Sequence, residues 1–277
     1  MSSGFPPVLE LNDGVTIPQL GLGVYLSTGK KGKQAVKSAL ALGYRHIDSA
    51  IFYDNEAEVG QAIRESKIDR KDIFVTSKLW SDNHGQKEAV KAVENSLKAM
   101  QTSYIDLYLI HSPYGGNLVS TYEALLGMKK AGKIRSVGVS NFGVQHLEGL
   151  RKAGLPTPSV NQIELHPWLQ QGEIVDYCTA HKITVEAYSP LTKGQWLDDE
   201  KLGKIAAKHQ RSPAQILIRW SLQKGFVVLP KSTNPKRIAE NFKLEDFQLD
   251  EEDMKVLKGF DADKHCTWDP TRVPWSG

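Results

Sequence analysis

Residues 73–111 of the chain read IFVTSKLWSDNHGQKEAVKAVENSLKAMQTSYIDLYLIH. The runs at 73–79 and 105–111 are short and rich in Ile, Val and Leu, which is typical of buried strands. Between them, apolar residues recur three and four positions apart along residues 86–100, so an amphipathic helix is predicted there. Two strands joined by a helix pair in parallel, because parallel pairing needs a long crossover. This stretch therefore predicts a β/α/β unit.

The same unit recurs along the chain. Eight strand candidates alternate with helical segments, and they cover residues 20–25, 45–49, 73–79, 105–111, 136–141, 160–166, 184–189 and 226–231. Ser212-Pro213 and Asn234-Pro235 each place a capping side chain before a proline that opens a helix. Eight units in about 250 residues predict a closed (β/α)8 TIM barrel, with a doubly wound open sheet as the alternative. Asp13-Gly14 predicts an N-terminal β-hairpin that caps the barrel, and we expect residues 1–277 to form a single domain.

The composition is that of a globular protein. The chain is 40% hydrophobic and 24% charged, and its net charge of +3 is too small to indicate nucleic acid binding. No apolar run approaches the roughly 20 residues that cross a bilayer, and the first residues do not form a signal peptide. Two cysteines far apart, Cys178 and Cys266, suit a reducing compartment, and a single disulfide between them is the alternative. We expect a cytoplasmic monomer with no nucleic acid or membrane partner.

Polar side chains stand at the predicted carboxyl ends of the strands, where barrel enzymes place their catalytic groups. Asp48, Lys78 and His111 are among them, and Tyr53 follows the second strand. Each has a structural interpretation, as a cap, a paired core charge, a core histidine or a packing aromatic. That interpretation does not explain why a carboxylate, an ammonium and an imidazole occur together. Lys78 and Asp48 would satisfy each other in the interior.

These four side chains suit acid catalysis. An ammonium beside a tyrosine stabilises the phenolate and lowers the pKa of the phenol toward the working pH. Such a tyrosine can donate a proton to a carbonyl oxygen, and an imidazole can hold the same oxygen by a hydrogen bond. We therefore expect Lys78 to lower the pKa of Tyr53.

Residues 229–237, LPKSTNPKR, form a candidate anion site. A helix is predicted to begin near Asn234, and Lys236 and Arg237 lie in its first turn, where positive charge opposes the helix dipole. A bound anion would take hydrogen bonds from the free N–H groups and from the basic side chains. The alternative is a tolerated surface mismatch that Glu240 partly offsets.

Several other site motifs are absent from the sequence. It has no His-Glu-x-x-His, no Cys-x-x-Cys and no EF-hand loop, so no metal site is predicted. Gly21-x-Gly23 lacks the third glycine of a dinucleotide-binding fingerprint, and there is no Gly-x-Ser-x-Gly elbow. The lysine-rich residues 29–33 do not match a P-loop and are predicted to form a solvated turn.

Nearly the whole chain, from about residue 8 to residue 261, resembles the aldo-keto reductase family, in particular its small microbial members with short loops. The matching stretches are LGLG at 20–23, GYRHIDSA at 43–50 with Tyr53 and Asn55-Glu56, VTSKLW at 75–80, DLYLIH at 106–111, GVSNF at 138–142, NQIELHP at 161–167, AYSPL at 187–191, and PKS at 230–232 with Arg237 and Asn241. Each stretch alone is weak, but their order and spacing together are specific.

The resemblance implies a barrel reductase that uses a nicotinamide cofactor, NADPH/NADP+. It implies that Asp48, Tyr53, Lys78 and His111 are catalytic, with Tyr53 as the proton donor. The implied cofactor contacts are Ser140, Asn141 and Gln162 at the carboxamide, Tyr188 against the ring, Ser189 and Leu191 along the pyrophosphate, and Lys231, Ser232, Arg237 and Asn241 at the 2′-phosphate. Tyr25 and Trp80 would form part of the substrate wall.

One departure from the family pattern concerns the substrate. Ser112 stands where many members have a tryptophan after the catalytic histidine, and the loops near it are short. We therefore expect an open pocket in which Ser112 and His111 contact the substrate. The predicted activity is NADPH-dependent reduction of aldehyde or ketone carbonyls to alcohols. The alternative is a nicotinamide-nucleotide-binding regulatory or structural barrel without significant turnover.

Overall fold

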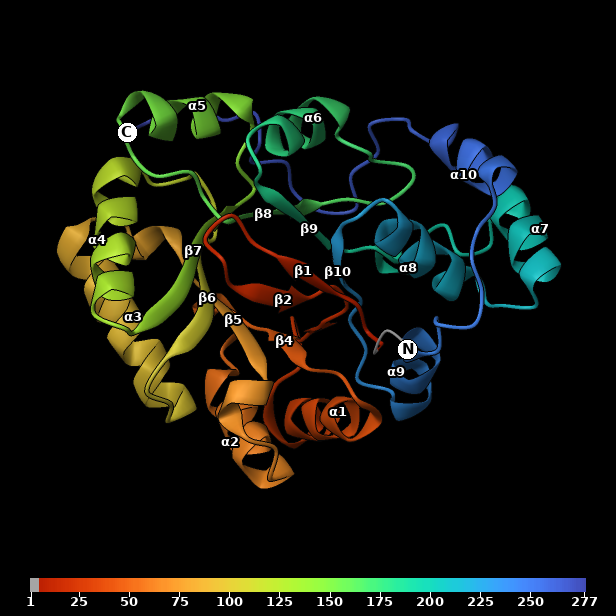
Figure 1. The fold of residues 1–277 in the computed structure, drawn as a ribbon, viewed down its shortest axis with the longest axis horizontal. Helices are drawn as coiled ribbons and strands as arrows, with labels where there is room; N and C mark the ends of the chain where they lie inside the picture. Colours follow the sequence, from red (N-terminus) through yellow and green to blue (C-terminus); the bar gives the residue numbers. More distant parts are fainter. Residues whose placement is uncertain (1–4) are drawn as a thin grey trace.

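Eight parallel strands form a closed barrel at the centre of the molecule (Figure 1). The computed structural model describes residues 5–277. In barrel order the strands are β3 (Leu22–Gly23), β4 (His46–Asp48), β5 (Phe74–Leu79), β6 (Ile105–Ile110), β7 (Ile134–Ser140), β8 (Val160–Glu164), β9 (Thr184–Tyr188) and β10 (Val227–Leu229). Parallel bridges from Leu20 to Val228 and from Gly23 to Lys231 join the first strand to the last. The predicted barrel is confirmed, and the open-sheet alternative is wrong.

Between residue 5 and residue 277, ten α-helices surround this barrel (Figure 1). They are α1 (Gly29–Leu42), α2 (Glu56–Ser66), α3 (Gln86–Met100), α4 (Leu118–Lys130), α5 (Val144–Lys152), α6 (Gly172–Ala180), α7 (Glu200–His209), α8 (Pro213–Gln223), α9 (Pro235–Phe242) and α10 (Glu251–Lys258). Two of them, α7 and α10, are additional to the eight-fold repeat. Within residues 5–277, no helix combines the length and the apolar character needed to span a membrane.

The predicted hairpin is present and closes one end of the barrel. Strands β1 (Val8–Glu10) and β2 (Thr16–Pro18) pair antiparallel, and Gly14 in the turn has a φ of 81°, which favours glycine. Leu11 and Ile17 are buried in one apolar cluster with barrel residues that include Phe74. The opposite end of the barrel, at the carboxyl ends of the strands, is not covered by this hairpin. The polar side chains predicted from the sequence lie at that end.

The predicted helix starts are also present. The Ser212 hydroxyl accepts a hydrogen bond from Gln215 N, and Asn234 Oδ1 accepts one from Lys236 N at 2.9 Å. The prediction of a solvated turn at residues 29–33 is wrong, because these residues form the first turn of α1. Gly32 is the reason that the helix can begin there: a Cβ atom on it would lie 2.0 Å from the Ser27 carbonyl oxygen.

Candidate active site

A buried ion pair lies at the carboxyl end of the barrel. Lys78 on β5 and Asp48 on the neighbouring β4 are 0% and 3% exposed. Lys78 Nζ donates to Asp48 Oδ1 and Oδ2 at 2.8 and 2.7 Å, and to the Ser49 carbonyl oxygen at 2.9 Å. A buried ammonium needs this number of acceptors, since an unpaired charge is costly in the interior. The pairing expected from the sequence is therefore present.

Tyr53 completes a chain of contacts from this pair. It ends a 3₁₀ turn at Ile51–Tyr53, and its hydroxyl lies 3.4 Å from Lys78 Nζ. The turn is fixed by Asn55, whose side chain accepts a hydrogen bond from the Ser49 hydroxyl and donates to the Val24 carbonyl oxygen. The loop after β4 is thus tied to the barrel, and the phenol is held beside the ammonium.

The electrostatics of Tyr53 differ from the sequence expectation. Burial, followed by the negative charge of Asp48, raises the pKa of Tyr53 well above its ordinary value. The expected net lowering of this pKa is therefore not found, because burial and then the Asp48 carboxylate outweigh the stabilisation of the phenolate by the nearby Lys78 ammonium. Tyr53 is consequently a neutral phenol that holds its proton at neutral pH.

His111 is placed directly after β6, with its ring edge toward two aromatic neighbours. Its ring centroid lies 5.7 Å from that of Tyr53 and 4.9 Å from that of Trp80, at nearly perpendicular angles. The Asn141 side chain donates to the His111 carbonyl oxygen at 2.9 Å and so fixes the backbone there. Burial, and then the nearby Lys78 charge, lowers the pKa of His111 well below its ordinary value. The imidazole is therefore neutral and can donate or accept one hydrogen bond.

A second buried acid, Glu186 on β9, lies behind the ion pair. Gln162 Nε2 donates to Asp48 Oδ2 at 2.8 Å and to Glu186 Oε2 at 2.6 Å, and His46 Nε2 lies 3.5 Å from Glu186 Oε1. Burial, and then the charge of Asp48, raises the pKa of Glu186 to about 8. Burial lowers the pKa of His46 to about 3. Both groups are therefore neutral at pH 7. Sequence reasoning missed Glu186, although a carboxylate within a buried strand was a usable signal.

Aromatic side chains form a wall beside Tyr53 and His111. Phe52 stacks on Trp80 with ring centroids 4.2 Å apart, and Tyr25 packs against Tyr53 at 5.0 Å. Trp268 from the C-terminal tail lies 5.8 Å from Trp80 and stacks on Tyr114 at 5.5 Å. Tyr25, Phe52, Tyr114 and Trp268 are exposed despite their size. The structure thus places the predicted Tyr25 and Trp80 together and adds three aromatic residues that the sequence reasoning did not name as site residues.

Ser112 has a different environment from the one expected. Its side chain is fully buried, and its hydroxyl accepts a hydrogen bond from Tyr114 N at 3.1 Å. This is the geometry of a turn cap, which competes with a role in the pocket. A substrate contact of Ser112 stays a prediction that this geometry does not favour.

The residues expected at the nicotinamide end lie together at the mouth of the barrel. Tyr188 donates from its hydroxyl to Asn141 Oδ1 at 2.9 Å, and Asn141 Nδ2 donates to the Ser140 hydroxyl oxygen at 3.0 Å. Asn141 and Ser189 adopt left-handed backbone conformations, with φ of 62° and 51°. Strained residues of this kind concentrate at functional sites. Gln162 lies on the adjacent strand and is held by the two acids described above.

The residues expected at the phosphate end lie on α9 and just before it: Lys231 and Ser232 precede the helix, Arg237 is in its first turn and Asn241 is in its last turn. Ser232 and Asn241 are buried, and Lys231 and Arg237 are exposed. Burial lowers the pKa of Lys231, and the neighbouring charges of Lys31 and Arg237 lower it further. Within residues 5–277 these three cations form no ion pair. An anion at the helix N-terminus would relieve their repulsion, so the residues fit a phosphate group. Leu191, expected along the pyrophosphate, is partly buried against the main core.

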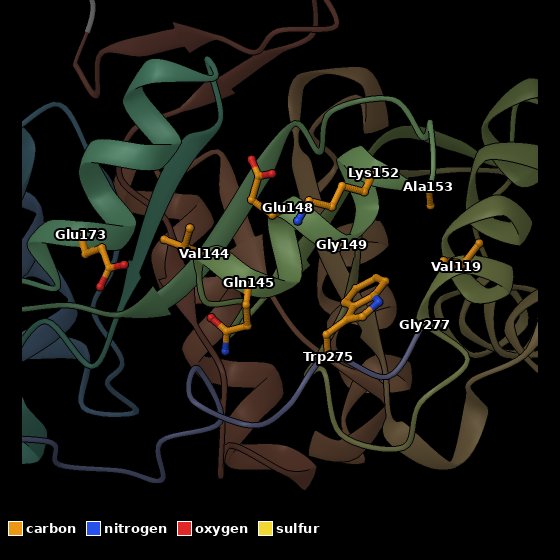
Figure 2. Close-up of a pocket in the computed structure, with 10 residues that line it drawn as sticks. All are labelled: Val119, Val144, Gln145, Glu148, Gly149, Lys152, Ala153, Glu173, Trp275 and Gly277. Atoms are coloured by element: carbon orange, nitrogen blue, oxygen red, sulfur yellow. The ribbon is translucent and has the colours of Figure 1, made fainter.

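A surface hollow lies away from these residues, between α5 and the end of the chain. Figure 2 shows Trp275 beside Gly149, with Gln145 and Glu148 on the same helix. A Cβ atom on Gly149 would lie 2.4 Å from the indole, so the glycine makes room for the tail to pack on α5. None of the four catalytic candidates lines this hollow. The packing of Trp275 on α5 holds the C-terminal tail, which also carries Trp268.

Comparison with known proteins gives one consistent result. The sequence model described as "Aldo/keto reductase family" matches residues 20–262. The glyoxal reductase of Bacillus subtilis (strain 168) is 44% identical over 274 residues, which are 99% of each chain. The methylglyoxal reductase DkgA of Escherichia coli (strain K12) is 42% identical over 269 residues, 96% of this chain and 97% of that protein. The crystal structure of a Bombyx mori aldo-keto reductase in complex with NADP has a TM-score of 0.89 and 37% identity, and the match covers 94% of both chains.

Proposed function

The chain belongs to the aldo/keto reductase family, and from this premise we propose which of its residues carry out the reaction. It is an NADP-dependent oxidoreductase that reduces carbonyl compounds. The alternative of a regulatory or structural barrel that binds the nucleotide without significant turnover is therefore not supported. The observation that carries the assignment of roles is the position of Lys78, which bridges the Asp48 carboxylate and the Tyr53 hydroxyl beside an aromatic wall.

In the proposed mechanism Tyr53 is the general acid. NADPH, when bound, supplies the hydride that the carbonyl carbon accepts, and the carbonyl oxygen then gains negative charge. Tyr53 donates its proton to this oxygen. An alkoxide is a much stronger base than a phenolate, so the transfer is favourable even though the pKa of Tyr53 is raised.

The other three residues prepare and support this proton transfer. Lys78 stabilises the phenolate that Tyr53 becomes, and Asp48 keeps the ammonium in place. The neutral His111 ring holds the carbonyl oxygen by a hydrogen bond and so orients the carbonyl carbon. Each group acts from a fixed position, which avoids reorganisation during the reaction.

We assign the two ends of the cofactor to two groups of residues. Lys231, Ser232, Arg237 and Asn241 would hold the 2′-phosphate. This is supported by Lys31, Lys231 and Arg237, which lie near one another and form no ion pair with any residue in the described range 5–277. Toward the barrel mouth, the nicotinamide carboxamide and ring would contact Ser140, Asn141, Gln162 and Tyr188. The pyrophosphate would contact Ser189 and Leu191. The hydrogen bonds among Ser140, Asn141 and Tyr188 support this assignment.

We propose small, planar α-dicarbonyl aldehydes as substrates. Two relatives are named for the reduction of glyoxal and methylglyoxal. The wall of Phe52, Trp80 and Trp268 beside His111 offers flat surfaces on which a conjugated dicarbonyl can stack.

The test is the loss of NADPH absorbance with glyoxal, methylglyoxal and a simple aldehyde. We expect Tyr53→Phe to fold and to bind NADPH, and to lose a factor of ~10²–10⁴ in kcat. Tyr104→Phe, a substitution of the same kind away from the site, should leave kcat unchanged. Near-normal turnover in Tyr53→Phe would overturn the role of the acid. Turnover of the simple aldehyde alone would overturn only the substrate class.

We further propose that the protein acts as a single-domain monomer in the cytoplasm. All four catalytic candidates come from one chain, and the hairpin and the tail pack against the same barrel. Cys178 and Cys266 are both free thiols, which suits a reducing compartment. Light scattering at the concentration of the assay tests the monomer, and a single unfolding transition tests the single domain.

A further inference from the structure

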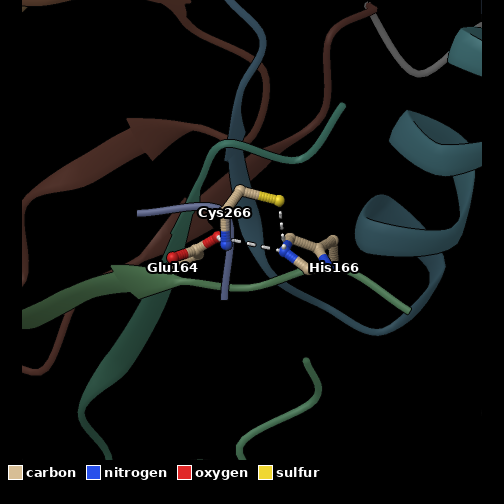
Figure 3. Close-up of side chains that lie close together, drawn as sticks. All are labelled: Glu164, His166 and Cys266. Carbon is tan, nitrogen blue, oxygen red and sulfur yellow. Dashed lines mark hydrogen bonds and ion pairs between the residues drawn. The ribbon is translucent and has the colours of Figure 1, made fainter. Parts of the chain in front are cut away.

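Three side chains with metal-binding atoms meet outside the catalytic site (Figure 3). Glu164 ends β8, His166 lies two residues later, and Cys266 belongs to the C-terminal tail. His166 Nε2 is 3.1 Å from Glu164 Oε1 and 3.6 Å from Cys266 Sγ, and the three ligand atoms lie within 4.8 Å of one another. Glu164 and His166 are buried, whereas Cys266 is partly exposed and leaves a path from solvent.

Two of these distances, those from His166 Nε2 to Glu164 Oε1 and to Cys266 Sγ, are close to the edge length of a tetrahedral coordination shell. Zinc binds nitrogen and oxygen ligands at about 2.0–2.2 Å and thiolate sulfur at about 2.3 Å, so two ligand atoms in a tetrahedral site lie roughly 3.3–3.6 Å apart. The nitrogen–oxygen and nitrogen–sulfur separations in the cluster are close to this range before any metal binds. Glu164 Oε1 also accepts the Cys266 N–H at 2.6 Å, which fixes the carboxylate and leaves a second lone pair on the same oxygen.

A second imidazole lies beside the cluster. His265 Nδ1 is 3.6 Å from Glu164 Oε2 and has no hydrogen-bond partner within residues 5–277. On the other side of the ring, His265 Nε2 faces Asp269 at 3.5 Å and Asp263 at 3.8 Å. Both of these aspartates also pair with Arg272, so Glu164 is the carboxylate that is available to a metal.

We propose that Glu164, His166 and Cys266 bind a thiophilic divalent transition metal such as zinc, with water as the fourth ligand. The thiol releases its proton to the solvent as the metal–sulfur bond forms. His166 would bind the metal through Nε2 with its ring proton on Nδ1, an atom that has no hydrogen-bond partner among the described residues. No atom is oxidised or reduced in this step.

Such a site would link the C-terminal tail to the barrel through the metal. Thr267 already donates from its backbone N–H and its hydroxyl to Glu164 Oε2, and the next residue, Trp268, belongs to the aromatic wall. A metal bond to Cys266 would add a coordinate bond to these hydrogen bonds. The bound metal would therefore stabilise the fold, and this effect does not depend on the proposed reductase mechanism.

The test is a titration of the untagged, full-length, chelator-treated protein with Co²⁺. A thiolate ligand gives cobalt a charge-transfer absorption in the near ultraviolet, and we expect this band to saturate at one equivalent. Cys266→Ser should abolish it. Cys178→Ser is the matched control, because Cys178 is the other thiol and lies buried in the core, away from the cluster. This variant should keep the band.

A second measurement covers the case in which a variant is less stable. Zn²⁺ should raise the unfolding temperature of the unaltered protein and of Cys178→Ser, and it should not raise that of Cys266→Ser. The proposal is overturned if the unaltered protein gives no band, or if the band or the Zn²⁺ effect survives in Cys266→Ser. NADPH turnover is measured separately, so failure of the metal site and failure of the proposed reaction are distinguishable.

Discussion

Lys78 Nζ lies 2.7 Å from Asp48 Oδ2 in the interior, and neither side chain has appreciable contact with solvent. Each charge is therefore tolerated only because of the other. The same ammonium reaches Tyr53, so the pair links the stability of the barrel to the position of the acid. This relationship leads to the first prediction.

Removing one partner of this pair should destabilise the protein more than removing both. We expect Asp48→Asn and Lys78→Met each to lower the free energy of unfolding by about 3–5 kcal/mol, because each leaves an uncompensated buried charge. The double variant should lose less than either single variant, because no unpaired charge then remains in the interior. Urea unfolding at pH 7 measures all three variants. A double variant that loses as much as or more than each single variant would contradict this dependence of one charge on the other.

The second prediction concerns the stability contributed by Glu186 as the pH changes. Its folded pKa of about 8 is above the ordinary glutamate pKa of 4.5, so the folded state keeps a proton that the unfolded state loses. Stability from this group is fully present below pH 4.5 and is lost as the pH rises toward 8. The loss is at most about 1.4 kcal/mol per pH unit.

Glu186→Gln isolates this effect, because a glutamine carries no titrating proton in either state and can still accept from Gln162. We expect the unaltered protein to lose stability relative to Glu186→Gln as the pH rises from 5 to 8. The difference in free energy of unfolding, variant minus unaltered protein, should therefore become more positive over this range. Asp48, Lys78 and His46 face the same group and remain in both proteins. Parallel stability curves across this range would contradict the raised pKa.

The sequence predicts the barrel well because its signals are local. The apolar runs at residues 73–79 and 105–111 lie within one residue of β5 and β6, and the proline-marked helices begin as expected. The prediction of a turn at residues 29–33 failed for a local reason: α1 already begins at Gly29, and the backbone folds so tightly there that only a glycine fits at position 32 beside the Ser27 carbonyl oxygen.

The candidate site could be predicted only where its residues follow a strand. Asp48, Lys78 and His111 share an end of the barrel by topology, so their proximity follows from the fold. Trp268 and Cys266 reach the site and the cluster from a tail about 100 residues beyond β8, and no spacing motif encodes that approach. The direction of the Tyr53 pKa could not be predicted from the sequence either, because it depends first on how deeply the phenol is buried and then on how near Asp48 lies.

The third prediction concerns selectivity for the cofactor. If Arg237 holds the 2′-phosphate, Arg237→Ala should weaken NADPH binding by about 1.5–3 kcal/mol, the scale of a charge-assisted hydrogen bond. NADH, which lacks this phosphate, should bind almost unchanged. Lys236→Ala removes an adjacent exposed cation of the same helical turn. It is the control for the loss of one positive charge without the loss of a direct phosphate contact. Equal losses for the two cofactors in a fluorescence titration would mean that Arg237 does not distinguish them.

The last prediction assigns substrate selectivity to the tail. Trp268 stacks on Tyr114 and approaches Trp80, so its indole offers a face to an aromatic aldehyde. An aromatic pair contributes about 0.5–1.5 kcal/mol beyond its buried area. Trp268→Ala should therefore lower kcat/KM for an aromatic aldehyde, relative to glyoxal, by about two- to tenfold. Ser112→Ala should leave this ratio unchanged, because the buried hydroxyl caps a turn. Steady-state kinetics on both substrates measure this ratio of kcat/KM values in each variant. A ratio that changes in Ser112→Ala but not in Trp268→Ala would show that the residue after β6, and not the tail, determines selectivity.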